Sequence, residues 1–319
     1  MRKFAALALV LALSGCSAQT PAPSLTPVDL KYCALSDKAG FDDDGLNRSV
    51  YAALQQLKVQ TGASVMALAV GDKLTAEAGL QELIDANCNA IITAGDDLAA
   101  PTLAKAKANA TIRFVSVGDV TETSATSPNF VSLQFNIYQA AYAAGYLAAA
   151  DAPSEEVATL DLLRSSESKK SLRAFIAGVE RFNSDNRAQV QIVNLTDIFS
   201  ASQDVVFVLS GNAEKLAGWP KTTDAGASKL IKLIGYARDW YADARNKALR
   251  PYILSSVVRF DVTDKVVAAV ASGAGSQSFD LASEQVGLVA ANDLAFPRKF
   301  STALDQIIQD FSNGKVKVG

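Results

Sequence analysis

The chain has 319 residues, of which 49% are hydrophobic and 20% are charged. This composition is typical of one or two globular α/β domains with well-filled cores, and it excludes a disordered chain. The formal net charge of −3 provides no basic field for phosphate backbones, which argues against a nucleic-acid partner. Histidine is absent, so serine–histidine triads, cysteine–histidine dyads and zinc–histidine sites are excluded.

The N-terminal segment predicts export. Arg2 and Lys3 precede an apolar run, Phe4 to Leu13, which is too short to span a bilayer permanently, and the segment ends Leu13-Ser14-Gly15-Cys16. These last four residues resemble the lipobox of bacterial lipoproteins. We therefore expect residues 1–16 to be a lipoprotein signal peptide, with lipidated Cys16 anchoring the protein to the extracytoplasmic face of the cell membrane. An ordinary cleaved signal peptide with a chance cysteine is the alternative.

The segment after Cys16 predicts a tether and a disulfide. Residues 17–27 are polar and proline-rich, which is typical of a flexible linker that holds a folded body off the membrane. Cys33 and Cys88 are the cysteines that remain, and two cysteines in an exported protein favour a disulfide. Cys33 falls in the first expected strand and Cys88 precedes the third, and these strands are neighbours in a doubly wound sheet of order 2-1-3. Two buried free thiols are the alternative.

Strand-like and helical patterns alternate through the first half of the mature chain. Strands are expected at 29–35, 64–70, 90–93 and 112–117, and helices at 47–61, 74–86 and 99–108. This alternation predicts a parallel sheet with helices on both faces. A long alanine-rich helix follows at 137–150, in which Gly145 suits close packing, and Ala152-Pro153 ends it.

A second alternating series begins near residue 151. Its strands are expected at 157–162, 189–193, 204–209 and 230–236, and its helices at 168–182 and 215–217. The remainder, with strands at 253–258 and 286–290 and helices at 263–272 and 301–313, is too short for a third domain. We therefore expect a two-lobed clamp with a multi-stranded hinge: an N-terminal lobe of residues 28–150 plus 251–275, and a C-terminal lobe of residues 151–250 plus 276–319.

Seven short segments together indicate a relationship to a protein family more specifically than any one of them does alone. They are GFDDDGLNRS at 40–49, NFVSL at 129–133, QAAYAAGYLAA at 139–149, FIAG at 175–178, LSSVVR at 254–259, VGL at 286–288, and the ending from Ile307 to Val318. In this order and spacing they resemble the basic membrane protein (BMP) family of ABC-transporter substrate-binding lipoproteins, whose better-known members bind purine nucleosides. The resemblance covers nearly the whole mature chain, from about Leu30 to Val318.

The resemblance implies an α/β, type I periplasmic-binding-protein fold, with two Rossmann-like lobes, parallel sheets and three crossovers. It implies a nucleoside-like small-molecule ligand, ABC permease subunits as partners and a monomeric state. It implies no cofactor, no metal and no catalytic residue.

The expected ligand-binding residues follow the strands of both lobes, because ligands of parallel sheets bind beyond the carboxyl ends of the strands. A carboxylate accepts hydrogen bonds from sugar hydroxyls, and an amide both donates and accepts toward a heterocycle. The alternative for the loop at 42–47 is a helix N-terminus that Asp43 or Asp44 caps. The expected residues are Asp42, Asp43, Gly45, Leu46, Asn47, Gly95, Asp97 and Asp119 in the first lobe, and Gly211, Asn212, Asp239, Trp240 and Arg259 in the second.

Several positions depart from the family's pocket pattern, among them the loops at 95–97, 161–163 and 210–212. Leu46 stands where the family has an aromatic residue that stacks on the nucleobase, and Ala237 stands where it has the acid expected to grip the ribose. Arg259 replaces a lysine, which keeps the charge and changes the hydrogen-bond geometry. Trp240 offers a replacement stacking surface, with core packing as the alternative.

Two other segments have plainer interpretations. The charged run ESKK at 167–170 is interpreted as a solvated helix start. The glycine-rich loop at 272–276 is interpreted as a crossover between the lobes rather than a phosphate-binding loop, because it does not join a strand to a helix start.

Three functions compete. The first is a binding protein that delivers a nucleoside-like solute to an ABC importer. The second is a ligand sensor, or a degenerate binding-fold lipoprotein without a transport role. The third is an envelope glycosidase that uses paired carboxylates such as Asp42 and Asp43. It ranks last, because adjacent residues of one loop do not place an acid and a base on opposite sides of a bond.

Overall fold

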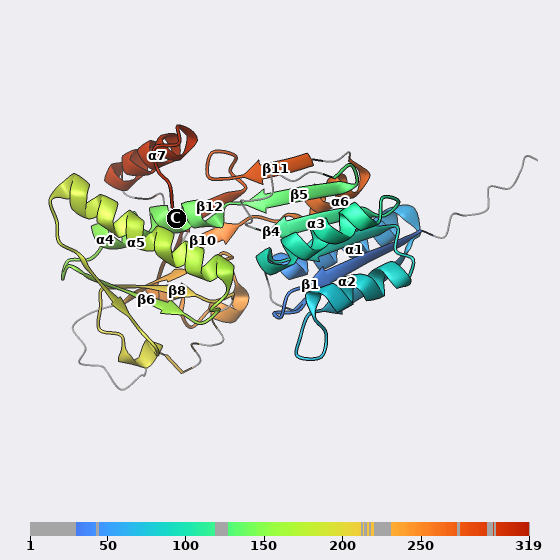
Figure 1. The fold of residues 1–319 in the computed structure, drawn as a ribbon. Helices are drawn as coiled ribbons and strands as arrows, with labels where there is room; N and C mark the ends of the chain where they lie inside the picture. Colours follow the sequence, from blue (N-terminus) through green and yellow to red (C-terminus); the bar gives the residue numbers. More distant parts are fainter. Residues whose placement is uncertain are drawn as a thin grey trace, which may run out of the picture.

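The computed structural model describes residues 30–42, 45–118, 127–211, 213, 216, 218–219, 231–272, 275–291, 296 and 298–318. These residues form two lobes side by side, each built around a six-stranded sheet (Figure 1). The expected signal peptide, tether and lipidated Cys16 lie outside the described residues. Within the described ranges, no helix combines the length and the apolar character that a membrane crossing requires.

The first sheet has the strand order β11-β5-β4-β3-β1-β2, and all its neighbouring strands are parallel. Every residue of β3 is buried, because helices cover both faces of the sheet, and such strands have continuous apolar sequences. The expected adjacency of strands 2, 1 and 3 is confirmed. The strands are β1 (Lys31–Ser36), β2 (Ser64–Ala69), β3 (Ala90–Ala94), β4 (Arg113–Gly118), β5 (Phe130–Phe135) and β11 (Gly275–Phe279).

Helices α1 (Leu46–Thr61) and α6 (Thr263–Ala271) pack together on one face of this sheet, while α2 (Ala76–Asp85) and α3 (Ala99–Ala108) cover the other. Helix α1 buries residues three or four apart along its length and ends at Gly62, whose φ of 72° suits a glycine. Together these helices shield the sheet, so that functional groups are confined to its ends.

Cys33 and Cys88 form a disulfide in the structure, with their Cα atoms 5.9 Å apart. The pairing of β1 with β3 brings them together, because Cys33 of β1 pairs with Ile91 of β3, and Cys88 lies shortly before Ile91 in the chain. Both cysteines are buried in the core between the sheet and α2. The bridge therefore ties the first strand to the connection that leads into β3.

The second sheet has the strand order β12-β10-β9-β8-β6-β7, in which β12 is antiparallel to β10 and the other pairs are parallel. One antiparallel strand is thus the departure from the expected parallel sheets. The strands are β6 (Glu156–Asp161), β7 (Gln191–Asn194), β8 (Val205–Leu209), β9 (Lys232–Gly235), β10 (Ile253–Arg259) and β12 (Val286–Ala290).

Helices α4 (Ile137–Ala150) and α5 (Ser166–Asn186) cover one face of the second sheet. The other face is covered by the 3₁₀ helices η2 (Ile198–Ser200), η4 (Ala244–Asn246) and η5 (Arg250–Tyr252), together with buried side chains that include Trp219 and Trp240. The helix expected at 215–217 falls largely outside the described residues.

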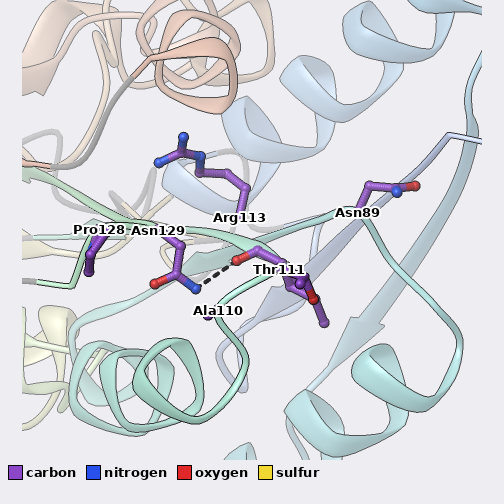
Figure 2. Close-up of a pocket in the computed structure, with 7 residues that line it drawn as sticks. Asn89, Ala110, Thr111, Arg113, Pro128 and Asn129 are labelled. Atoms are coloured by element: carbon purple, nitrogen blue, oxygen red, sulfur yellow. Dashed lines mark hydrogen bonds between the residues drawn. The ribbon is translucent and has the colours of Figure 1, made fainter.

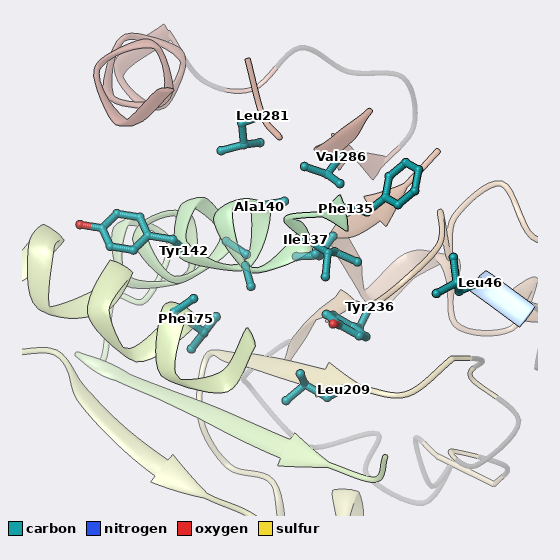
Figure 3. Close-up of a cluster of buried hydrophobic side chains, with 14 of the residues drawn as sticks. Leu46, Phe135, Ile137, Ala140, Tyr142, Phe175, Leu209, Tyr236, Leu281 and Val286 are labelled. Atoms are coloured by element: carbon teal, nitrogen blue, oxygen red, sulfur yellow. The ribbon is translucent and has the colours of Figure 1, made fainter. Parts of the chain in front are cut away.

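Helices α4 and α5 cross at two glycines in close contact. A Cβ atom on Gly145 would lie 2.0 Å from the carbonyl oxygen of Phe175, and one on Gly178 would lie 2.0 Å from that of Tyr142. The approach lets Phe175 stack on Phe207 of the sheet, with ring centroids 4.6 Å apart. The buried cluster that results includes Phe175, Tyr142 and Leu209 (Figure 3). The expectation that Gly145 serves close packing is confirmed.

Helix α7 (Arg298–Ser312) packs on α4, and Asp310 ties it to α5. The Asp310 carboxylate is buried and accepts hydrogen bonds from Gln306 at 2.9 Å and Arg181 at 3.2 Å. The amide of Gln306, followed by Lys315 and Arg181, holds the pKa of Asp310 below its ordinary value, although burial acts to raise it. Asp310 is therefore a charged carboxylate in the folded protein.

The expected lobe limits are wrong in three places. Helix α4, expected in the N-terminal lobe, packs on the second sheet, and β10, expected in the same lobe, is a strand of the second sheet. Strand β11, most of which was expected in the C-terminal lobe, is the edge strand of the first sheet. The chain thus passes between the lobes after β5, after β10 and after β11, and the expected three crossovers are confirmed. Because α6 and β11 both belong to the first lobe, the loop at 272–276 is not a crossover.

Candidate ligand-binding site

The two sheets point the carboxyl ends of their parallel strands toward each other. The 3₁₀ helix η1 (Asp96–Leu98) follows β3 in the first lobe and contacts α5, which follows β6 in the second. The hydroxyl of Ser166 donates a hydrogen bond to Asp97 Oδ1 at 2.9 Å, so the lobes touch at this point. We define the inter-lobe site as Asp37, Asn47, Asp96 and Asp97 of the first lobe with Ser166, Glu167, Tyr236 and Arg259 of the second.

Asp37 organises the first-lobe side of this site. It directly follows β1, and its Oδ1 accepts hydrogen bonds from Asn47 Nδ2 at 2.8 Å and from the amide of Ala39 at 2.9 Å. Its own amide donates to Ala94 O at the end of β3, 3.0 Å away. The carboxylate is thus fixed where two central strands end, which is where this type of sheet binds ligands.

Two glycines allow the acidic loops to lie this close together. A Cβ on Gly95 would lie 2.9 Å from Cβ and Oδ2 of Asp37, and the φ of 122° at Gly95 is one that other residues rarely adopt. A Cβ on Gly118 would lie 2.6 Å from Asp96 Oδ1. Gly95 was expected to contact the ligand itself, and the structure shows it making room for Asp37.

The expected residues around the start of α1 have separate positions. Asn47 is buried and bonded to Asp37, whereas Asp42 is exposed. Leu46 is also buried and belongs to the large core cluster (Figure 3). Gly45 is the N-cap of α1, and the capping alternative, Asp43 or Asp44, lies outside the described residues.

Four polar side chains form a network on the second-lobe side. Arg259 and Tyr236 bind the two oxygens of Glu167: Arg259 Nη2 donates to Oε2 at 2.5 Å, and Tyr236 Oη donates to Oε1 at 2.8 Å. Ser171 Oγ lies 2.9 Å from Tyr236 Oη. Burial, reinforced by the charge of Glu167, raises the pKa of the Tyr236 hydroxyl well above its ordinary value. Tyr236 therefore remains a protonated donor.

Asp161 shapes the turn that carries Glu167. Its Oδ1 accepts hydrogen bonds from the amides of Leu163 at 3.0 Å and Arg164 at 2.8 Å, and its Oδ2 accepts one from Ser168 Oγ at 3.0 Å. Ser165 then caps α5 by accepting from the Ser168 amide. This well-bonded turn fixes the first residues of α5 against η1 of the other lobe.

The other expected second-lobe residues serve the local structure. Asp239 Oδ1 accepts from the amides of Tyr241 and Ala242 and so stabilises a turn. Trp240 has no exposed surface, packs against Gly235, and donates its indole N–H to Tyr236 O. The alternative of core packing is thus what the structure shows for Trp240. Gly211 is half-buried after β8, and the expected residues Asp43, Asp119 and Asn212 lie outside the described residues.

Two surface hollows lie at the opposite ends of the sheets. One, of about 260 Å³, is formed where β3, β4 and β5 begin, by residues that include Asn89, Arg113 and Asn129 (Figure 2). The other, of about 550 Å³, lies where β6 and β9 begin, beside the ion pair of Lys232 with Asp151. Neither includes a residue of the inter-lobe site. Across the part of the chain that the structure describes, no group of three His, Cys, Asp or Glu side chains is arranged to hold a metal ion.

The sequence also matches a model of a known protein family. That family, Bmp, is described as ABC transporter substrate-binding protein PnrA-like, and the match covers residues 31–206, which is more than half of the chain. The chain belongs to the Bmp family. As a Bmp protein it is a substrate-binding protein of the ABC-transporter class, which implies a small-molecule ligand, permease partners and an extracytoplasmic location. The resemblance found in the motifs is confirmed. A comparison with curated proteins finds no match.

Solved structures similar to this Bmp protein confirm the two-lobed fold. An ABC-transporter solute-binding protein from Aeropyrum pernix K1 has a TM-score of 0.69 at 15% identity, over 90% of this chain and 92% of that one. One from Conexibacter woesei has a TM-score of 0.60 at 16% identity, over 91% and 98%. GanP, a glucose-galactose binding protein from Geobacillus stearothermophilus, has a TM-score of 0.56 at 13% identity, over 84% and 99%. At such identities the likeness shows the fold alone.

Proposed function

We propose that this Bmp protein delivers a nucleoside-like solute to an ABC importer from a lipid anchor at Cys16. The observation that carries the proposal is the inter-lobe site, in which polar side chains from the carboxyl ends of both sheets meet across the Asp97–Ser166 hydrogen bond. A solute held there contacts both lobes, so its binding favours the closed arrangement of the clamp.

The chemistry of the site suits a solute with hydroxyl and N–H groups. Carboxylates on both lobes accept hydrogen bonds from such donors, and the amide of Asn47 adds both donor and acceptor capacity. A nucleoside carries hydroxyls on its sugar and donors and acceptors on its base. Family membership supports the same ligand class.

The test is a thermal-shift screen of the soluble body, residues 28–319, against nucleosides, nucleobases, sugars and vitamins. A ligand at about a hundredfold excess over its Kd stabilises the folded state by about 2.7 kcal/mol. For a protein of this size that raises Tm by roughly 5 to 10 °C. If no nucleoside raises the Tm of protein that circular dichroism shows to be folded, the nucleoside assignment is wrong.

The proposal includes the anchor, the oxidised state and the absence of catalysis. We expect Cys16→Ser to release the protein from the membrane fraction, the Cys33–Cys88 bridge to be present in the exported protein, and the protein to be a monomer. We also expect no turnover, so nucleosides incubated with purified protein are recovered intact. A product peak in chromatography of that mixture would instead indicate an enzyme, including the glycosidase considered above.

One observation favours a second candidate, a sensor or a binding-fold lipoprotein without a transport role. Arg259, which stands where the family commonly has lysine, forms an ion pair with Glu167 of its own lobe. If folded protein binds none of the screened solutes, this second candidate is favoured over the importer component.

A further inference from the structure

Glu167 is held more firmly than a solvated helix start requires. Its two carboxylate oxygens have separate donors, Tyr236 Oη at 2.8 Å and Arg259 Nη2 at 2.5 Å. Both donors are themselves buried: Tyr236 has no exposed surface, and the Arg259 side chain is 4% exposed. Ser171 is also fully buried, and its hydroxyl is hydrogen-bonded to the hydroxyl of Tyr236. The carboxylate is thus fixed in one orientation by rigid, well-packed partners.

Glu167 also lies next to the contact between the lobes. Glu167 follows Ser166, the residue that bonds to Asp97 across the lobes, and its side chain is 19% exposed although both oxygens are bonded. Each carboxylate oxygen has two lone pairs, so the bonds to Tyr236 and Arg259 leave further acceptor capacity. Binding a ligand to a fixed acceptor loses less conformational entropy than binding it to a mobile one, because the fixed side chain is already ordered.

The position of Glu167 compensates for the missing acid at Ala237. Both partners of Glu167 adjoin Ala237: Tyr236 precedes it in the chain, and the amide of Arg259 donates to Ala237 O at 3.4 Å. Ala237 has a φ of 70°, so the backbone keeps an unusual conformation there without a polar side chain. The carboxylate on this side of the site therefore comes from the start of α5 instead of from the end of β9.

We infer that Glu167 is a ligand-binding residue that determines specificity, accepting hydrogen bonds from a hydroxyl or N–H group of the solute. Glu167 balances the charge of Arg259, and the other charged groups that define the inter-lobe site are the carboxylates of Asp37, Asp96 and Asp97. The site as defined is therefore negative, so it favours neutral or cationic donors over anions. The inference rests on the proposed function and deepens it.

The experiment measures Kd by isothermal titration calorimetry for the wild-type soluble body and for Glu167→Gln. The probes are adenosine, 2′-deoxyadenosine, 3′-deoxyadenosine and adenosine 5′-monophosphate. Glu180→Gln is the matched control, because Glu180 is an exposed glutamate on the same helix. Circular dichroism and Tm without ligand establish that each variant is folded.

We expect Glu167→Gln to raise the Kd for adenosine about tenfold or more, since it removes a charged acceptor, and Glu180→Gln to leave it unchanged. In the wild type, one of the two deoxyadenosines binds more weakly than adenosine, and in Glu167→Gln that difference disappears. The monophosphate binds the wild type at least tenfold more weakly than adenosine. The wild-type measurements test the inference even if Glu167→Gln does not fold.

Two results overturn the inference and leave the proposed function standing: an unchanged Kd for adenosine in folded Glu167→Gln, or wild-type protein that binds the monophosphate as tightly as adenosine. Folded wild-type protein that binds neither adenosine nor the other nucleosides of the screen overturns the proposed function, and the inference fails with it.

Discussion

The close crossing of α4 and α5 makes Gly145→Ala and Gly178→Ala the most informative substitutions in the fold. Each added Cβ atom would lie 2.0 Å from a backbone carbonyl oxygen of the facing helix, whereas real Cβ contacts under 3.0 Å essentially do not occur. A backbone oxygen cannot rotate away as a side chain can. The helices must therefore separate by about 1 Å to admit either methyl group, an overpacking strain that the tightly packed core resists.

The cost follows from this separation. A gap of about 0.5 to 1 Å forfeits a quarter to a half of the dispersion energy between atoms that were in contact. Because the clash is with backbone atoms, we take the upper end of the usual overpacking cost, about 3 kcal/mol, from which the better helix propensity of alanine subtracts about 1 kcal/mol. We expect each substitution to destabilise the protein by about 2 kcal/mol, which lowers Tm by roughly 4 to 8 °C.

The assay is thermal and urea denaturation of the soluble body, followed by circular dichroism. Gly71→Ala is the control, because a Cβ there meets no atom within 4 Å, and we expect it to change stability by less than about 0.5 kcal/mol. The double variant Gly145→Ala with Gly178→Ala should cost less than the two single costs combined, because helices already separated for one methyl group have room for the other. Unchanged or increased stability in both single variants would refute the reasoning.

Three further predictions concern other parts of the structure. Replacing Cys33 and Cys88 together by alanine should lower the free energy of unfolding by about 4 kcal/mol, as chain entropy predicts for a sequence separation of 55 residues, and urea denaturation of oxidised protein measures this. Asp310→Asn should cost about 1 to 3 kcal/mol at about pH 7. Because the pKa of Asp310 is lowered in the folded state, this stabilisation is complete above the unfolded value of 3.8 and is lost as the pH falls through the folded value, so the Tm difference from wild type should shrink in acid. Because the pKa of Tyr236 is raised, Tyr236→Phe should leave the ultraviolet tyrosine titration of the folded protein unchanged up to about pH 10.

Helices with a strong apolar pattern and a clear stop were predicted well from the sequence. The helix expected at 137–150 is α4, Ile137–Ala150, because an unbroken apolar stretch ends there at Ala152-Pro153. Two strands were not predicted. Strand β11, with the sequence GSQSF, lies at the sheet edge with three of its residues exposed and so has no apolar signal. In strand β5, Ser132 and Gln134 interrupt the apolar pattern.

The site was harder to predict than the fold, because its side chains are joined across long distances in sequence. Asn47 was expected, but its partner Asp37 is a single aspartate after a strand and belongs to no motif. Glu167 lies in a charged run of the kind that usually faces solvent, and its partners Tyr236 and Arg259 are 69 and 92 residues away. Only the tertiary structure shows that these groups are adjacent.

The three passages between the lobes have a consequence for the order in which the molecule folds. A growing chain completes β1 to β5 early, but α6, which shares one face of this sheet with α1, and β11, which closes its β5 edge, come almost at the end. Until then α1 alone covers that apolar face, and the β5 edge of the first sheet is open for hydrogen bonding. During synthesis from the N-terminus, a native first lobe therefore cannot form until nearly the whole chain exists, a delay that suits a protein with an extracytoplasmic location.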